Sequence, residues 1–433
     1  MLHDPSHYES PPIAEEIKLE TGDIDVLRRL AGELARIAAL PVQQEKARLW
    51  QKLNDLQSER PLLWINEIPW HEMDVDGELT LVAAHPWARE QERELRRTLY
   101  QWRHMPGDMI VSPYLACPLA VHSTDFGIME DVDVVRTDAA SDVVSRHFKI
   151  QIRDFADLEK IHMPVVTHNE AATYCRHEAM CRVYDGILPV RKMGQTHIWF
   201  TPWDYLIRWW GIQEAMIDLV DRPELVHAGV QRMIDAWMTE LDQFETLNVL
   251  SLDCDNTRIG SGGYGYTNQL PGDPFDPAGV GPRNMWGCSN AQIFSEVSPQ
   301  MHWEFALKHD LRWLSRWGLT YYGCCEPLDR KIEILRRIPN LRKISVSPWC
   351  NTPSVVAKIG GDYVMSRKPN PAILAEDRWH PERARRDLCD FLDAARGGHV
   401  ELIMKDVSTV RYQPQRLWEW ARIAQEVAQQ YAT

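Results

Sequence analysis

The sequence predicts a (β/α)8 barrel with an N-terminal helical extension. The chain has 433 residues, a length that fits one barrel plus an extension. Its C-terminal half alternates short apolar runs with amphipathic helical segments, which is the pattern of parallel βαβ units. A sustained run of such units in a chain of this length favours a barrel over an open sheet.

The expected domain boundary lies before the first strand. Residues 1–59 are predicted to form a helical extension, and residues 60–433 the catalytic barrel domain. In the N-terminal half, spacing and breakers predict these elements in order: helix 24–40, a break at Pro41, helix 47–56, strand 62–65, helix 86–103, strand 108–114 and a hairpin at 147–152.

The C-terminal half shows the alternation most clearly. The expected elements are helix 223–247 with Asp221 as its N-cap, strand 248–253, strand 291–297, helix 299–317, strand 319–324, helix 330–338, strand 341–346, helix 353–359, strand 363–366, helix 381–395, strand 400–404 and helix 414–429. A loop rich in Gly, Pro and Tyr spans 260–283, where a barrel carries substrate-binding loops.

Composition excludes several classes of function. The formal net charge of −14 disfavours nucleic acid and anionic lipid as partners. The first residues lack the basic start and apolar stretch of a signal peptide, and no apolar run is long enough to span a bilayer. The nine cysteines are an odd number without an export signal, so we expect free thiols or metal ligands in a cytoplasmic protein.

The sharpest chemical signal is Gly323-Cys-Cys-Glu326, at the end of an expected strand. On a strand, Cys324 and Glu326 share a face and can give zinc two ligands, with Asp406 or Asp253 as a third. If the strand ends at Gly323, Cys325 turns inward instead. The alternative is that both thiols are simply packed in the core, as free cysteines commonly are.

Other strand ends carry further candidates. Asp253 and Asp255 can orient a substrate or act as acid–base groups, although either can simply begin a turn. Arg367 and Lys405 are predicted to hold an anionic group of the substrate, with a surface ion pair as the alternative. Because Lys405 and Asp406 alternate on a strand, only one of them is expected to point inward. The predicted cavity walls are Tyr264 and Trp286.

These motifs resemble the uroporphyrinogen decarboxylase superfamily, most clearly from Trp286 to Trp420. The matching segments are Arg60-Pro-Leu-Leu-Trp64, Ala291 to Pro299, Tyr321-Tyr-Gly-Cys-Cys-Glu326, Ile344-Ser-Val-Ser-Pro348 and Lys405-Asp-Val-Ser408. The resemblance implies a (β/α)8 barrel. In the decarboxylase, arginines after the first strand bind porphyrinogen carboxylates, whereas this chain has Glu67 and no arginine between Pro61 and Trp70.

The resemblance therefore favours the zinc-dependent methyltransferase branch, whose His-x-Cys motif aligns with the Cys324 segment. It implies zinc held by Cys324, Cys325, Glu326 and Asp406. It also implies a small methylated substrate and a methyl acceptor that is a thiol or a corrinoid on a separate protein. A homodimer is an open possibility. The alternatives are a decarboxylase that uses Asp253 or Asp255 on a small carboxylated substrate, and a barrel that binds a ligand without turnover.

Overall fold

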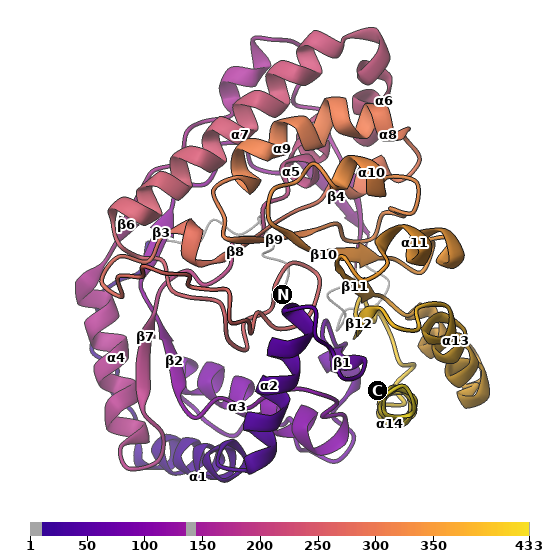
Figure 1. The fold of residues 1–433 in the computed structure, drawn as a ribbon. Coiled ribbons are helices and arrows are strands. Elements are labelled where there is room, and N and C mark those ends of the chain that lie inside the picture. The colour runs from indigo at the N-terminus through magenta and orange to yellow at the C-terminus, as the bar shows by residue number, and fades with distance from the viewer. Residues whose placement is uncertain (1–10, 136–143, 433) are drawn as a thin grey trace.

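The computed structural model describes residues 11–135 and 144–432. Its main feature is a six-stranded, all-parallel sheet in the order β1-β12-β11-β10-β9-β8. Figure 1 shows that these strands lie towards the inside of the molecule and that helices pack outside them. The strands are β1 Leu62–Ile65, β8 Trp286–Ser289, β9 Leu319–Tyr322, β10 Leu341–Val346, β11 Val364–Arg367 and β12 His399–Met404.

The two faces of this sheet differ in chemistry. Ile344 and Val346 belong to the large apolar core that the helices form against the sheet. The other face carries polar groups, because Lys343 alternates with Ile344 along β10 and forms an ion pair with Glu401 of β12 at 3.0 Å. Both ionic side chains are fully buried. We call this polar side the inner face.

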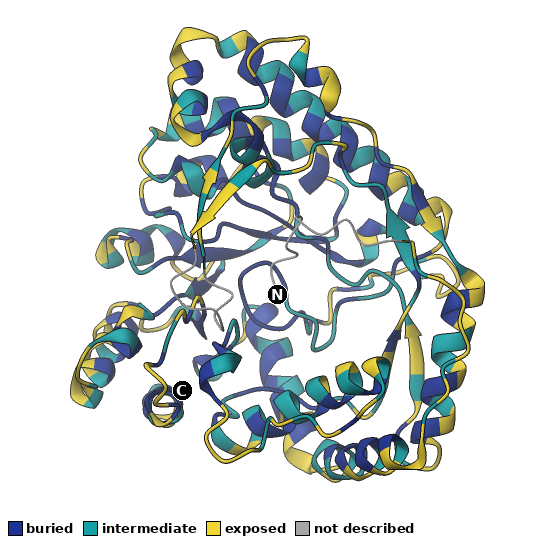
Figure 2. Ribbon diagram, turned by 180° about the vertical axis from the view of Figure 1, so that it is seen from behind, coloured by how far each residue is buried: buried dark blue, intermediate teal, exposed yellow. Residues whose placement is uncertain are grey.

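The outer helices have a buried side and an exposed side, as Figure 2 shows. Their buried residues are mainly apolar. Around the sheet the helices are α7 Pro223–Thr246, α8 Pro299–His302, a π-helical turn Trp303–Leu307, α9 Lys308–Leu314, α10 Ile332–Leu335, α11 Thr352–Ile359, α12 Ala372–Ala375, α13 Pro381–Ala394 and α14 Gln415–Gln430. Further helices are α3 Pro86–His104, α4 Glu170–Tyr184, α5 Pro202–Trp210 and α6 Ile212–Asp221.

The parallel arrangement continues beyond the six strands but does not close as one ladder among the described residues. Strand β2 (Leu115–Pro118) pairs in parallel with β7 (Val190–Met193). A single parallel bridge then joins Gln195 to Leu250. The protein is thus an α/β structure with a six-stranded parallel sheet.

Two short antiparallel strand pairs lie outside the six-stranded sheet. Strand β4 (Val132–Val135) pairs with β5 (Ser145–Phe148), and β3 (Val121–Ser123) pairs with β6 (Val166–His168). The expected hairpin at 147–152 is confirmed in part, as β5 ends at Phe148.

The N-terminal helices pack onto the rest of the chain. Helix α1 (Thr21–Ala38) lies against α3, and α2 (Pro41–Asn54) places Trp50 against Tyr264, with ring centroids 5.3 Å apart. The Trp50 indole also donates to the Asp108 carbonyl at 2.8 Å. Pro41 begins α2 rather than only ending α1, because the first turn of a helix tolerates proline.

Several expected features differ in the structure. The strand at 108–114 is absent, and β2 begins only at Leu115. Within 248–253, only the bridge at Leu250 forms. Residues 292–294 form a 3-10 turn, and the strand precedes it as β8. Asp221 ends α6 instead of capping α7, whose capping position is Arg222.

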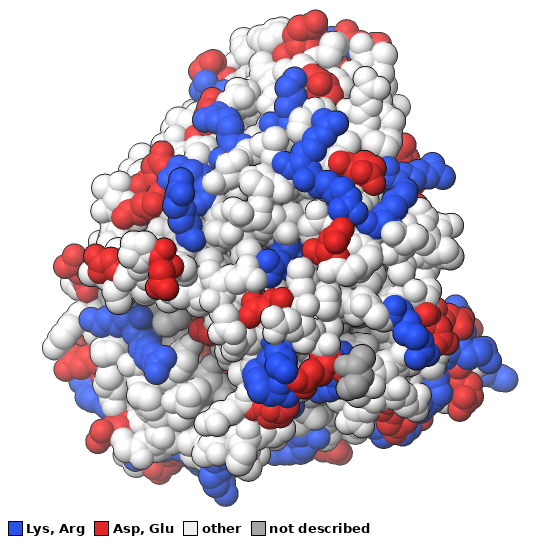
Figure 3. All heavy atoms as spheres, in the orientation of Figure 1, with Lys and Arg blue, Asp and Glu red and all other residues white. Residues whose placement is uncertain are grey.

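Acidic and basic side chains are interspersed on the face shown in Figure 3. In the ranges 11–135 and 144–432, no helix has the length and apolar character needed to cross a membrane.

Candidate functional site

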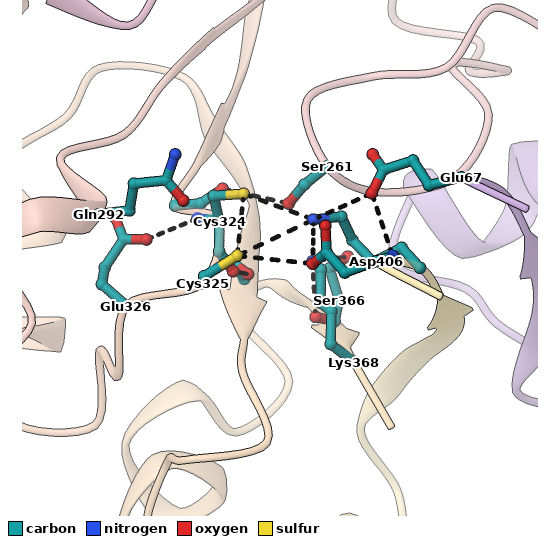
Figure 4. Close-up of polar contacts among 12 residues, drawn as sticks. Glu67, Ser261, Gln292, Cys324, Cys325, Glu326, Ser366, Lys368 and Asp406 are labelled. Atoms are coloured by element: carbon teal, nitrogen blue, oxygen red, sulfur yellow. Dashed lines mark hydrogen bonds and ion pairs between the residues drawn. The ribbon is translucent and has the colours of Figure 1, made fainter. Parts of the chain in front are cut away.

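A cluster of thiol, ammonium and carboxylate groups lies where β1, β9 and β12 end (Figure 4). Its centre is the Lys405 Nζ. This atom lies 3.7 Å from the Cys324 Sγ and 3.9 Å from the Cys325 Sγ. It also lies 2.7 Å from the Asp406 Oδ2 and 3.5 Å from the Glu67 Oε2. Lys405 and Cys324 are each only 4% exposed.

Both cysteines belong to this cluster because β9 ends before them. The strand stops at Tyr322, and Gly323 adopts a positive φ of 99°. A Cβ at position 323 would lie 2.5 Å from Leu328, so the tight turn requires glycine. Beyond this turn strand alternation no longer applies, and the two Sγ atoms lie 3.6 Å apart. The sequence alternative in which Cys325 turns inward is therefore correct.

Lys405 and Asp406 also both reach the cluster, contrary to the expectation that only one would. Strand β12 ends at Met404, and Asp406 has a positive φ of 55°. This conformation folds the Asp406 side chain back onto its neighbour's ammonium. Lys405 remains buried while the Asp406 side chain is 45% exposed, so Asp406 forms the solvent side of the site.

The charges favour a thiolate at Cys324. Its pKa is lowered by the hydrogen bond from Cys325 and by the positive charge of Lys405, which together outweigh burial. The same hydrogen bond raises the pKa of the Cys325 thiol, because it gives that proton an anionic acceptor. Burial opposes the charged form of Lys405, but Cys324 and Glu67 raise its pKa overall. These contacts therefore favour the thiolate form at Cys324 and the protonated form at Cys325, beside the positive charge of Lys405.

Glu67 is a member of the cluster that the sequence analysis did not select. It follows β1, has a positive φ of 51°, and forms an ion pair with Arg258 at 2.8 Å. It also accepts a hydrogen bond from the Asp406 backbone N–H at 3.1 Å. Although burial opposes it, Arg258 and Lys405 lower the pKa of Glu67. Its position just after the first strand could have identified Glu67 as a site candidate from the sequence.

Glu326 contacts the cluster only through the backbone. Its carboxylate accepts hydrogen bonds from the backbone N–H of Cys324 at 2.8 Å and of Ala291 at 3.3 Å. Burial raises the pKa of Glu326, whose side chain is fully enclosed. The structure therefore places it as a positioning group for the Cys324 turn, and among the described residues no contact joins it to either Sγ.

A second layer of polar groups lies on the inner face next to the thiols. Lys368 donates to Ser366 Oγ at 2.8 Å and to the Tyr321 hydroxyl. The Ser261 hydroxyl is 2.9 Å from the same Tyr321 oxygen and 3.3 Å from the Gly323 carbonyl. Burial lowers the pKa of Lys368 to about 7. These residues fix the turn that carries the cysteines.

The two aspartates expected to act in catalysis already have partners. Both Asp253 carboxylate oxygens accept from the Trp286 backbone N–H, at 3.0 and 3.1 Å. Burial raises the pKa of Asp253 well above its ordinary value. Asp255 accepts hydrogen bonds from the Tyr114 hydroxyl at 3.1 Å and from Thr257. No contact of the described residues brings either carboxylate to the thiols.

The expected substrate-binding residues other than Lys405 lie elsewhere. Tyr264 packs against Trp50, beside α2. The Trp286 indole is fully buried and donates to the Gly265 carbonyl at 2.8 Å. Arg367 extends over the Phe391 ring of α13, on the helix-covered face. The structure thus gathers Cys324, Cys325, Lys405 and Asp406 and separates the other candidates from them.

Two amides add unpaired polar atoms at strand ends. Asn66 follows β1 and Asn290 follows β8. In both, the side-chain nitrogen and oxygen are buried without a hydrogen-bond partner in the described part of the chain. Buried polar groups are normally paired, so such atoms mark places where a ligand can bind.

The donor atoms suit zinc in kind but not in arrangement. Two thiols and a carboxylate are typical zinc ligands. However, the described ranges hold no group of three histidine, cysteine or acidic side chains arranged around one metal position. The Lys405 ammonium lies between Cys324, Cys325 and Asp406, so a metal ion held by them requires this ammonium to move away.

Comparison with known proteins adds little to this geometry. No family model matches the chain, and no curated protein sequence matches it. Among solved structures it is similar to a methyltransferase from Methanosarcina mazei, with 9% identity and a TM-score of 0.49, over 90% of this chain and 99% of that one. A likeness at this level assigns neither a family nor a function.

Proposed function

We propose that this protein is a methyl-transfer enzyme whose reacting centre is the Cys324–Cys325–Lys405 cluster. The observation that carries the proposal is the pair of thiols 3.6 Å apart, with a buried ammonium within 3.9 Å of both sulfurs. A thiolate is both a strong nucleophile and a metal ligand, and methyl transfer uses either property. The resemblance of this sequence segment to the zinc motif of zinc-dependent methyltransferases also supports the proposal.

Each neighbouring residue has a defined part in this proposal. Lys405 holds Cys324 as a thiolate, and Glu326 fixes its backbone. Cys325 keeps its proton and donates a hydrogen bond to the Cys324 sulfur. Asn66 and Asn290 supply unpaired amides to a small methylated substrate that enters between the strand ends. A fully closed (β/α)8 barrel and cytoplasmic location belong to the same proposal.

The proposal extends to zinc and to a corrinoid partner. After displacement of Lys405, Cys324, Cys325 and Asp406 would hold the metal, and zinc would supply Lewis-acid activation of the methylated atom. A corrinoid acceptor would belong to a separate protein, as the sequence resemblance implies. Metal analysis of purified protein tests zinc directly, and a Lys405→Met variant should bind it more tightly.

The function is tested with a panel of methyl donors that covers oxygen, nitrogen and sulfur leaving atoms. Methanol, methylamines, aryl methyl ethers and dimethyl sulfide would be incubated with the protein, with or without added zinc. The acceptor would be cob(I)alamin, whose spectrum changes on methylation, or 2-mercaptoethanol. We expect turnover with one donor class. Lack of methyl transfer to both acceptors from every class would contradict the proposal.

A further inference from the structure

A cavity of about 540 Å³ lies directly beside the thiol cluster. Glu67 lines it and also contacts Lys405, and the cavity wall continues through Val407 and Ser408, which follow Asp406. The volume lies within the range typical of small-molecule sites, roughly 300–1,000 Å³. None of its charged lining groups except Glu67 takes part in the cluster described above.

The charged groups that line this cavity differ in whether they already have partners. Arg93 and Arg97 of α3 enter its lining, as do the acidic Asp74 and Glu67. Glu67 is already balanced by Arg258 and Lys405. Asp74 accepts hydrogen bonds from the Leu79 N–H at 3.1 Å and from Thr80 at 2.9 Å. Its carboxylate is therefore satisfied without an arginine.

Arg93 is the cation available to a ligand. Within 11–135 and 144–432 its guanidinium has no hydrogen bond, ion pair or ring contact. Arg97 differs, because its guanidinium lies 5.2 Å from the Trp70 ring centroid and 3.8 Å from Glu94. An unpaired guanidinium in a cavity presents a planar fork of donors that matches a carboxylate.

The remaining lining supports a ligand with an apolar body. His71 contributes a buried Nε2 atom without a hydrogen-bond partner among the described residues. Its nearest acidic group, Glu72, lies 3.7 Å away and already accepts hydrogen bonds from Thr409 and from the Val410 N–H. The apolar part of the lining is formed by Ile68, Pro69, Trp70, Leu79, Leu81 and Val407.

We infer that this cavity binds a small monocarboxylic acid, with the carboxylate on Arg93 and the apolar body against the Trp70 side of the cavity. As the substrate site of a methyl transfer, this inference rests on the proposed function and narrows the substrate to a methylated carboxylic acid. The claim that the cavity binds a carboxylic acid depends only on the residues that line the cavity. Arg93 lies on α3 and does not contact the thiol cluster. We therefore give it a role in selecting the substrate through its carboxylate and no role in the chemical step.

Calorimetric titration of the full-length protein tests the inference without any turnover. The probes are benzoate, cyclohexanecarboxylate and benzamide, the last being a neutral analogue of benzoate. We expect at least one carboxylate to bind at least about tenfold more tightly than benzamide, because charge-assisted pairs are the stronger ones. Arg93→Gln should weaken that carboxylate about tenfold and leave benzamide unchanged.

Arg36→Gln is the matched control, since Arg36 is an exposed arginine on α1 outside the cavity lining. It should leave all affinities unchanged, and thermal melting would verify that both variants are folded. The inference would be overturned if neither carboxylate bound more tightly than benzamide, if no carboxylate bound at all, or if the tighter carboxylate bound Arg93→Gln as well as it binds the unaltered protein. These outcomes are independent of the methyl-transfer assay, so failure of one does not imply failure of the other.

Discussion

The Lys405 Nζ lies 3.7 Å from the Cys324 Sγ, in a pocket where both side chains are only 4% exposed. An ammonium at this distance from a thiol, with little water to screen it, favours the thiolate. Lys405 in turn is held by the carboxylates of Asp406 and Glu67. The reactivity of Cys324 should therefore respond in opposite directions to the removal of these charges.

Lys405→Met should raise the pKa of the Cys324 thiol, because the positive charge that favours the thiolate is lost. Methylthiolation of Cys324 by methyl methanethiosulfonate, followed by mass spectrometry across pH, should be about tenfold slower near neutral pH. Asp406→Asn removes a negative charge and should shift the profile the other way. Identical profiles in all three proteins would show that Lys405 does not control the thiol.

Glu67→Gln should destabilise the fold at neutral pH by about 2 kcal/mol, because Arg258 and Lys405 lose a shared anionic partner. The folded-state pKa of Glu67 is lowered from 4.5, so its stabilising effect is present above that value and disappears as the pH falls. Urea unfolding at pH 7 and at acidic pH should show the difference shrinking. Glu90→Gln, an exposed change on α3, is the control. A difference independent of pH would contradict this account.

The Lys343–Glu401 pair should be strongly coupled, since both side chains are fully buried. Glu401→Gln leaves the Lys343 ammonium without its anion and should cost about 3–5 kcal/mol in unfolding free energy. The double variant Lys343→Met, Glu401→Gln should recover part of that loss. Additive effects in a double-mutant cycle would show that the pair is not coupled in the folded protein.

The C-terminal half could be predicted closely, because its strands and helices have clear apolar periodicity. Strand β10 lies at Leu341–Val346 as expected. Strand β8 was missed because it contains Gly287, which weakens a strand signal. There the glycine is needed for packing, since a Cβ would lie 2.2 Å from the Trp317 ring. That contact is non-local and cannot be read from sequence.

The site could be predicted in part. Strand ends pointed to Cys324, Cys325, Lys405 and Asp406, which do meet in the structure. Their relative directions could not be derived from strand alternation, because Gly323 and Asp406 leave the strands through positive φ angles. Arg258 and Ser261 come from an irregular loop without periodicity, so only the folded structure places them beside the cluster.

The most direct test of the central claim is the rate of methyl transfer by a Cys324→Ser variant, measured with the donor found in the panel. Serine keeps the shape of the turn but lacks an ionisable thiol near neutral pH. We predict a loss of at least about 100-fold relative to the unaltered protein. Cys389→Ser, which changes a free cysteine on α13, should keep the full rate. An unchanged rate in Cys324→Ser would contradict the account.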